Sequence, residues 1–269
     1  MKATVPTDAG ARFQIGDSRL KAKGSKSNKT PIVMKEGLMA YEVTYPPQDP
    51  HKSNMNITFT QPGYFPSTQA RFRFKIFPDP AWPWTSTSGK LAGFAIGKGA
   101  SSGGDYSTNG ASVRLSWDDN GGLSPYVYPE LHQALHTLKS HKKVTPEQLD
   151  QDPSFYADVP KGAQSGISPA GTHMWHPRKG GQNSYALAFV RGRWNQIELY
   201  VKLNTPGKYD GIIEYSINGK TVRFEKMRLR YDSSSIESVQ IHTFFGGGKD
   251  MTPHTQVKMW YADFEFYKT

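Results

Sequence analysis

The sequence predicts an all-β protein, and three observations lead to this expectation. From Ile32 onward, apolar and polar residues alternate in short runs, which is the period of side chains on the two faces of a strand. The composition, with 26 glycines, 19 prolines and 13% aromatic residues, fits many turns better than helices. The pair Asn218-Gly219 is a strong hairpin signal, because both central residues of such a turn need positive φ.

The alternating runs give the expected strands in chain order. Two early strands precede a run in which cations and apolar residues alternate, and a hairpin and two closing strands lie near the C-terminus. The expected strands are residues 37–43, 56–59, 71–76, 112–117, 126–128, 194–204, 212–217, 220–225, 238–245 and 259–267. The chain shows no internal repeat and no domain boundary after its basic N-terminal segment, so a single domain is expected over residues 31–269.

Two stretches interrupt this pattern. Residues 130–143 place apolar side chains on one helical face, which predicts a short helical insertion. Three histidines, His132, His136 and His141, lie on or near this helix, but no carboxylate completes a metal-binding set. We therefore expect solvated surface histidines and no metal site. The glycine-rich residues 162–181 predict a long surface loop, which could form a cleft wall.

The chain is basic, with 33 Lys and Arg against 23 Asp and Glu, a formal charge of +10 and a pI near 9.5. This balance favours an anionic partner such as a nucleic acid, an anionic lipid or an acidic polysaccharide. The one dense cluster of cations is Arg19–Lys29, so residues 1–30 are expected to form a flexible basic segment. The sequence has no evident recognition helix or RNA-binding strand motif, which argues against a nucleic-acid partner.

The composition also excludes some kinds of chemistry. The chain has no cysteine, so it forms no disulfide and has no thiolate nucleophile. Its first residues lack the apolar core of a signal peptide, and no run approaches the roughly 18 apolar residues of a membrane span. We therefore expect no membrane partner. Either the protein is not secreted by the signal-peptide route, or a leader precedes the residues of this sequence.

The densest set of unusual signals lies between the third expected strand and the helical insertion. Lys90 sits between glycines in a segment that we expect to be a loop. The next run places Ser112 and Arg114 on one strand face, and a second run after a turn places Tyr126 and Tyr128 on one face. If these runs pair, one sheet surface carries a serine, an arginine and two tyrosines, with a lysine nearby. Such a surface suits an anionic substrate and proton transfer.

A second set of cations lies on the third expected strand, where Arg71, Arg73 and Lys75 share one face. One interpretation is a half-buried strand with a solvated cationic face. The other is a groove for a polyanion, and in either case three neighbouring cations repel one another unless something offsets them. With Lys98 and His242, these three residues are the candidate substrate-binding residues.

Several short motifs together resemble polysaccharide lyase family 14. They are Gly89-Lys90-Leu91-x-Gly93, Ser112-x-Arg114, Tyr126-x-Tyr128, Trp194 with Val201-Lys202-Leu203-Asn204, Asp210-Gly211, Asn218-Gly219 and Phe244-Phe245-Gly246-Gly247. The resemblance runs from about residue 35 to the end. The spacing is most similar to that of the chlorella-virus lyases, and the molluscan alginate lyases are more distant relatives. The helical insertion has no counterpart in this family pattern.

The resemblance implies a β-jelly roll of two antiparallel sheets, one of them concave and forming the cleft. It also implies β-elimination of 1,4-linked polyuronates such as alginate or polyglucuronate, which leaves an unsaturated uronate at the new non-reducing end. The partner would then be an acidic polysaccharide of the cell-wall type, and the location virion-associated or extracellular; we also expect a monomer. The alternative is a non-catalytic jelly-roll module that binds an acidic polysaccharide in the same groove.

The candidate catalytic residues match what elimination beside a uronate carboxylate needs. Arg114 is permanently charged and can grip a carboxylate in a bidentate manner. Lys90 either adds positive charge where the enolate-like intermediate develops or, with a lowered pKa, acts as the base for the C5 proton. Tyr126 or Tyr128 can move the proton, and Ser112 holds the substrate or orients one of these groups. This chemistry requires no metal and no cofactor.

Overall fold

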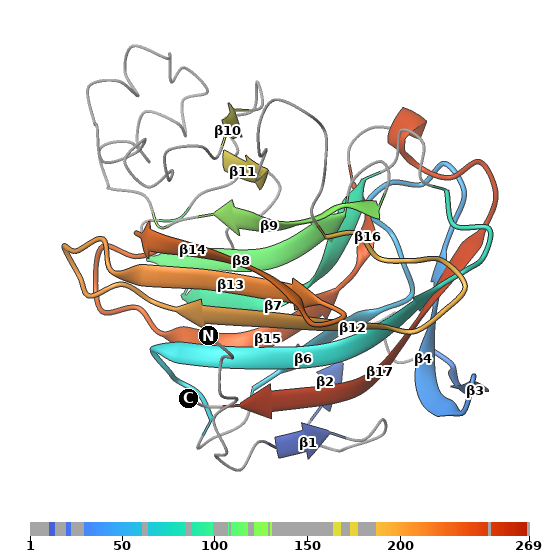
Figure 1. The fold of residues 1–269 in the computed structure, drawn as a ribbon, viewed down its shortest axis with the longest axis horizontal. Helices are drawn as coiled ribbons and strands as arrows, with labels where there is room; N and C mark the ends of the chain where they lie inside the picture. The colour runs from blue at the N-terminus through green and yellow to red at the C-terminus, as the bar shows by residue number, and fades with distance from the viewer. Residues whose placement is uncertain are drawn as a thin grey trace.

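The computed structural model of the chain contains two antiparallel β-sheets packed face to face (Figure 1). The structure describes residues 11–13, 20–22, 30–60, 64–83, 88–98, 107, 109–117, 121–128, 130, 164–167, 173–176, 187–246 and 249–267. In this part of the chain, every complete element is a strand except for a 3₁₀ turn at Lys249–Met251. The expected all-β class and the jelly roll of two antiparallel sheets are confirmed. The concave cleft stays a prediction.

The first sheet, here called the β6 sheet, has eight strands. Its path runs through β14 (Lys220–Met227), β13 (Gly211–Ile217), β12 (Asn195–Lys202), β6 (Gln69–Pro78), β17 (Val257–Tyr267), β4 (Leu38–Tyr45) and β3 (Ile32–Lys35), and β1 (Ala11–Phe13) also pairs with β17. The expected hairpin between β13 and β14 is confirmed, and its two turn residues, Asn218 and Gly219, have φ angles of 50° and 82°.

The second sheet, here called the β8 sheet, has nine strands. Its path runs through β10 (Gln164–Ile167), β11 (His173–His176), β9 (Leu123–Tyr128), β8 (Gly110–Trp117), β7 (Gly89–Gly97), β15 (Ile236–His242), β5 (Asn56–Phe59) and β2 (Leu20–Ala22), and β16 (Phe244–Phe245) also pairs with β7. Figure 1 shows β10 and β11 beyond β9, at one edge of this sheet.

The inner faces of the two sheets form a hydrophobic core. Alternate residues of the central strands belong to it, such as Phe72 and Phe74 on β6 and Val113 and Leu115 on β8. Because successive side chains point to opposite faces of a strand, the polar residues between them lie on the outer faces of the sheets. The outer face of the β8 sheet, here called the site face, carries the candidate catalytic residues.

An aromatic cluster links the two sheets beneath the start of β7. Tyr45 of the β6 sheet contacts Trp82 and Phe245 edge to face, with ring centroids 5.1 and 5.3 Å apart. Trp117, the last residue of β8, contacts Phe245 at 5.3 Å. A Cβ atom on Gly89 would lie 2.1 Å from the Trp117 ring, so no larger residue fits there without displacing the cluster. This glycine lets β7 begin directly over the core.

Two expectations need correction. The structure describes two strands, β10 and β11, within residues 162–181, which we expected to be a loop. These strands pair with each other, and β11 pairs with β9, so they extend the β8 sheet. The segment around Lys90 is also a strand, the start of β7, rather than a loop. Glycine-rich segments lack the apolar alternation that signals a strand, which is why the sequence pattern gave the wrong prediction.

Some expected features lie partly or wholly outside the described residues. The expected helix at 130–143 lies outside the described residues, apart from Glu130. Within residues 1–30, the structure describes β1 and β2, which pair with β17 and β5 respectively. A flexible basic segment stays a prediction for the rest of that range. Among the residues described, no helix is long and apolar enough to cross a membrane.

Candidate active site

Lys90 reaches the site face because β7 carries a β-bulge. Lys90 pairs with Ser116 of β8, Gly93 pairs with Arg114, and the register shifts between these two pairs. Both residues between Lys90 and Gly93 belong to the core, so the two ends of the bulge lie on the opposite face. A bulge is a common means of re-aiming a side chain beside a functional site.

The pairing of β8 with β9 brings together the other four candidate residues. Ser112 stands opposite Tyr128, and Arg114 stands opposite Tyr126. All four side chains are buried, although none of them belongs to the core between the sheets. The expected pairing of the two runs on one face is therefore confirmed. The catalytic roles of these residues stay a prediction.

The lysine and the two tyrosines form one chain of contacts. The Lys90 Nζ lies 3.3 Å from the centroid of the Tyr126 ring, in the position where the ring face attracts a cation. The Tyr126 and Tyr128 hydroxyl oxygens are 2.5 Å apart and share a hydrogen bond, and their rings meet edge to face at 5.0 Å. The Lys90 amine and the hydroxyls of Tyr126 and Tyr128 therefore lie close enough together to contact neighbouring atoms of one substrate.

The site face concentrates positive charge. Burial, followed by the charge of Arg114, lowers the pKa of Lys90 to about 7. Burial also lowers the pKa of Arg114, but a guanidinium starts so far above neutrality that it stays charged. Within the described part of the chain, no carboxylate pairs with either cation. An anionic group that entered this site would relieve the repulsion between them.

His242 joins this cluster from β15, the strand beside β7. Burial and the charge of Arg114 lower the pKa of His242 to about 4, so its imidazole is neutral at neutral pH. Its ring contacts Phe244 at a centroid distance of 4.8 Å. Two residues earlier on the same strand, the Gln240 Oε1 accepts a hydrogen bond of 3.3 Å from the Arg114 Nη2. The sequence interpretation missed Gln240, although its spacing from His242 places both on one strand face.

The structure does not bring Lys98 into the cluster. Lys98 directly follows β7, at the end of the strand opposite to Lys90, and its side chain is exposed. Its backbone N–H donates a hydrogen bond of 2.8 Å to the Asn109 carbonyl oxygen. A role for Lys98 in substrate binding stays a prediction. Among the residues with described positions, no three His, Cys, Asp or Glu side chains are grouped to hold a metal ion.

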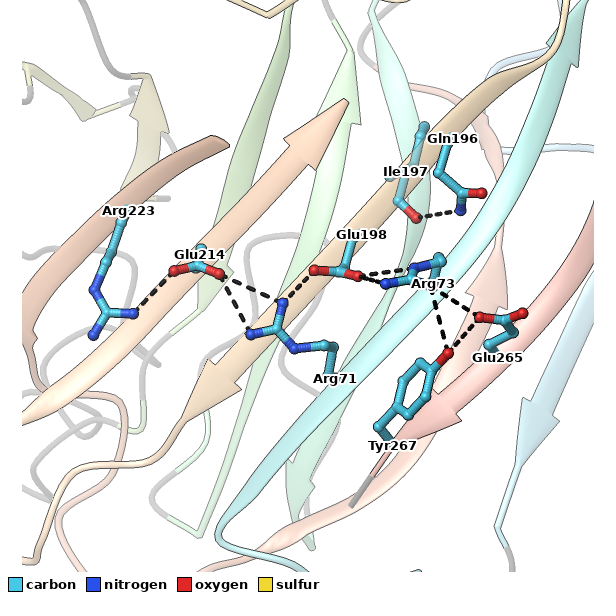
Figure 2. Close-up of polar contacts among 9 residues, drawn as sticks. All are labelled: Arg71, Arg73, Gln196, Ile197, Glu198, Glu214, Arg223, Glu265 and Tyr267. Atoms are coloured by element: carbon cyan, nitrogen blue, oxygen red, sulfur yellow. Dashed lines mark hydrogen bonds and ion pairs between the residues drawn. The ribbon is translucent and has the colours of Figure 1, made fainter. Parts of the chain in front are cut away.

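Arg71, Arg73 and Lys75 lie on the other sheet. They project from β6 onto the outer face of the β6 sheet, so the hydrophobic core separates them from the site face. Glu198 of β12 bridges Arg71 and Arg73 (Figure 2), with 2.7 Å between its carboxylate and the Arg73 Nη2. The Lys75 Nζ lies 2.6 Å from the Asp263 carboxylate.

The ion pairs continue across the outer face of the β6 sheet. Arg73 also pairs with Glu265 at 3.2 Å, and Arg71 pairs with Glu214 at 3.4 Å (Figure 2). These carboxylates offset the repulsion among the cations of β6. These contacts favour the half-buried strand with a cationic face over the polyanion groove, and a role for Arg71, Arg73 and Lys75 in substrate binding stays a prediction. Alternation along a strand identifies a face, but it does not say which sheet the strand joins.

The comparisons with known proteins agree with the resemblance found in the motifs. The sequence model of the family Polysaccharide lyase 14 matches residues 152–264. Exolysin of Paramecium bursaria Chlorella virus 1 is 27% identical over 250 residues, which are 86% of this chain and 33% of that protein. Both comparisons show that the chain is similar to members of polysaccharide lyase family 14. The chain spans about a third of the length of this curated relative.

Two solved alginate lyase structures share the fold. The crystal structure of alginate lyase vAL-1 from Chlorella virus aligns with a TM-score of 0.70 and 20% identity, over 94% of this chain and 95% of that one. The marine family 14 alginate lyase from Aplysia kurodai aligns with a TM-score of 0.65 and 18% identity, over 95% and 89% of the two chains. The range matched by the family, 152–264, includes Gln240 and His242 but none of the five candidate catalytic residues. Their roles are therefore argued from the geometry of the site.

Proposed function

We propose that this chain is a polysaccharide lyase that cleaves 1,4-linked polyuronates, such as alginate or polyglucuronate, by β-elimination. One observation carries the proposal: two cations, the half-buried Lys90 and the buried Arg114, lie beside a hydrogen-bonded tyrosine pair, with no carboxylate partner in the described chain. A uronate is an anion with an acidic C–H next to its carboxylate, so it supplies both the missing charge and the proton to be moved. The names of the family relatives support the same substrate class.

The proposed reaction uses the site residues in distinct roles. Arg114 binds the uronate carboxylate and neutralises it, which makes the C5 proton more acidic. One tyrosine, as phenolate, takes that proton, and charged Lys90 stabilises the negative charge that develops on the carboxylate. The electron pair forms the C4–C5 double bond, the bond from C4 to the glycosidic oxygen breaks, and the other tyrosine protonates that oxygen. Ser112, opposite Tyr128, holds the substrate.

The hydrogen bond between Tyr126 and Tyr128 supports this scheme. After one turnover the base has gained a proton and the acid has lost one, so the pair must be reset. A single proton transfer between the two hydroxyl oxygens, which are 2.5 Å apart, restores the starting state without solvent. The scheme is balanced for either assignment of base and acid within the pair.

The experiment is incubation of the full chain with alginate and with polyglucuronate at several pH values. A lyase produces near-ultraviolet absorbance from the new double bond and lowers the viscosity of the polymer. A non-catalytic module that binds the same polysaccharides would do neither, and it would retain the polymer on a column. Binding without a double bond in any polyuronate, from neutral to strongly alkaline pH, would establish the binding module instead.

Two further points belong to this proposal. The five candidate catalytic residues lie on three adjacent strands of one chain, which supports action as a monomer; light scattering of the purified protein tests it. An acidic wall polysaccharide lies outside the cell membrane, which supports an extracellular or virion-associated place of action. We further propose that residues 31–269 form a single domain, because strands from both sheets share one core.

A further inference from the structure

We propose that Gln240 positions Arg114 and is a second hydrogen-bond donor to the substrate carboxylate. The proposal rests on the function proposed above. Gln240 lies on β15 and Arg114 on β8, with β7 between them. The residues stand in one cross-strand row, because Gln240 pairs with Gly93 and Gly93 pairs with Arg114. Side chains in such a row lie side by side on one face of the sheet.

Gly93 leaves the space that this contact needs. A Cβ atom at Gly93 would lie 2.2 Å from the Val113 carbonyl oxygen, 2.4 Å from the Arg114 Cα and 2.9 Å from the Arg114 Cγ. Two of these atoms are backbone atoms, which cannot move aside without disturbing the pairing of β7 with β8. With no side chain on the middle strand, Arg114 can cross it and reach Gln240, about 10 Å away across two strand spacings.

The hydrogen bond fixes the orientation of the Gln240 amide. A guanidinium donates hydrogen bonds and accepts none, so the group that meets the Arg114 Nη2 at 3.3 Å must be the amide oxygen. The amide nitrogen then points elsewhere with two protons to donate, and it has no hydrogen-bond acceptor among the described residues. A carboxylate held by Arg114 would bring an acceptor to the same place.

The choice of an amide is explained by comparison with the β6 sheet. There, Arg71 and Arg73 are held by the carboxylates of neighbouring strands, which neutralise them (Figure 2). Gln240 holds Arg114 in place without cancelling its charge. A neutral partner therefore leaves the arginine both ordered and attractive to an anion, which is what recognition of a substrate carboxylate requires.

The test compares Gln240→Glu and Gln240→Leu with the unchanged protein, using kinetics on alginate and polyglucuronate. Glu at this position pairs with Arg114, cancels its charge and repels the substrate, so KM should rise about 10- to 100-fold. Leu removes both hydrogen bonds of the amide, and KM should rise about 10-fold or more. The charge-matched control is Gln256→Glu, at an exposed position just before β17. This variant should have the same KM and kcat as the unchanged protein.

A pH profile separates positioning from a merely structural role. The charge of Arg114 lowers the pKa of Lys90, so a carboxylate at position 240 that offsets this charge should move the Lys90 ionisation in the kcat/KM profile to higher pH; a loss of packing alone would not. If either variant folds with an unchanged melting temperature and keeps KM within about twofold, the inference is overturned. If the unchanged protein neither cleaves nor binds any polyuronate, the proposed function is wrong, and the inference fails with it.

Discussion

Lys90 is the residue whose charge state matters most to the proposed reaction. Its pKa of about 7, lowered by burial and by Arg114, means that both its forms are populated near neutral pH. The charged form can stabilise the developing negative charge, whereas the neutral form can act as a base. The sequence left these two roles open, and the mechanism proposed here uses the charged form.

We predict that the kcat/KM profile contains an ionisation near pH 7, because Lys90 of the free enzyme loses its proton there. In the kcat profile this ionisation should lie at a higher pH, since a bound uronate carboxylate favours the charged lysine. Steady-state kinetics over the pH range measures both profiles. Lys90→Met should lower kcat about 10²- to 10³-fold and remove this ionisation. A profile without this ionisation, or one that Lys90→Met leaves unchanged, would contradict a role for charged Lys90.

Gly93 is the second residue on which the site depends. Because a Cβ there would lie 2.2 Å from the Val113 carbonyl oxygen and 2.4 Å from the Arg114 Cα, Gly93→Ala must displace β7 or β8. We predict a loss of about 1–3 kcal/mol of unfolding free energy, together with a higher KM because Arg114 is displaced. Thermal melting and kinetics measure the two effects.

Gly246→Ala is the matched control for that change. A Cβ at Gly246 would meet Lys90 Nζ and Ser88 Oγ at 3.9 Å, which is ordinary contact, and the backbone there is not left-handed. We expect this variant to keep the melting temperature of the unchanged protein. Equal melting temperatures for both glycine variants would show that the row Gln240–Gly93–Arg114 is less tightly packed than its geometry indicates.

At the scale of elements, β6 and β8 use arginines in different ways. Both strands alternate apolar core residues with polar residues on the outer face, among which are Arg71 and Arg73 on β6 and Arg114 on β8. On β6, the cross-strand neighbours are carboxylates, so Arg71 and Arg73 join ion pairs that tie strands together (Figure 2). On β8, the neighbours of Arg114 are Tyr126 and Gln240, which are uncharged and leave the arginine charge available to an anionic substrate. Cross-strand partners thus separate a structural arginine from a candidate catalytic one.

This difference gives a prediction for the β6 sheet. Arg73→Gln should leave KM and kcat for polyuronate within about twofold of the unchanged protein, because Arg73 lies on the sheet opposite the site. It should cost about 1–3 kcal/mol of stability, since Glu198 and Glu265 lose a partly buried partner. Urea unfolding and kinetics provide the comparison. A large rise in KM would instead support the interpretation of β6 as part of a polyanion groove.

At the scale of the whole molecule, much of the architecture could be predicted from the sequence. Period-two alternation located most strands of both sheets, and the Asn218-Gly219 pair located a hairpin, because both signals are local. The same alternation placed Ser112, Arg114 and the two tyrosines on shared faces, so their meeting needed only the pairing of adjacent runs.

The rest depended on pairings between distant parts of the chain. Gln240 and His242 lie near Arg114 because β15 joins the β8 sheet beside β7. The sequence of residues 238–245 does not indicate which strand will pair with it. The bulge that turns Lys90 toward the site is a register shift, which period-two reasoning does not detect. For the same reason, the cations of β6 could be assigned to a face but not to a sheet.

The central claim is that the site around Lys90 and Arg114 eliminates across C4 and C5 of a uronate. Mass spectrometry of the oligosaccharides released from polyglucuronate or alginate tests it most directly. We predict that every new non-reducing end lacks one molecule of water relative to a hydrolysis product, and that Lys90→Ala releases almost none of these products. Products of hydrolysis, or unsaturated products released equally by Lys90→Ala, would contradict the account.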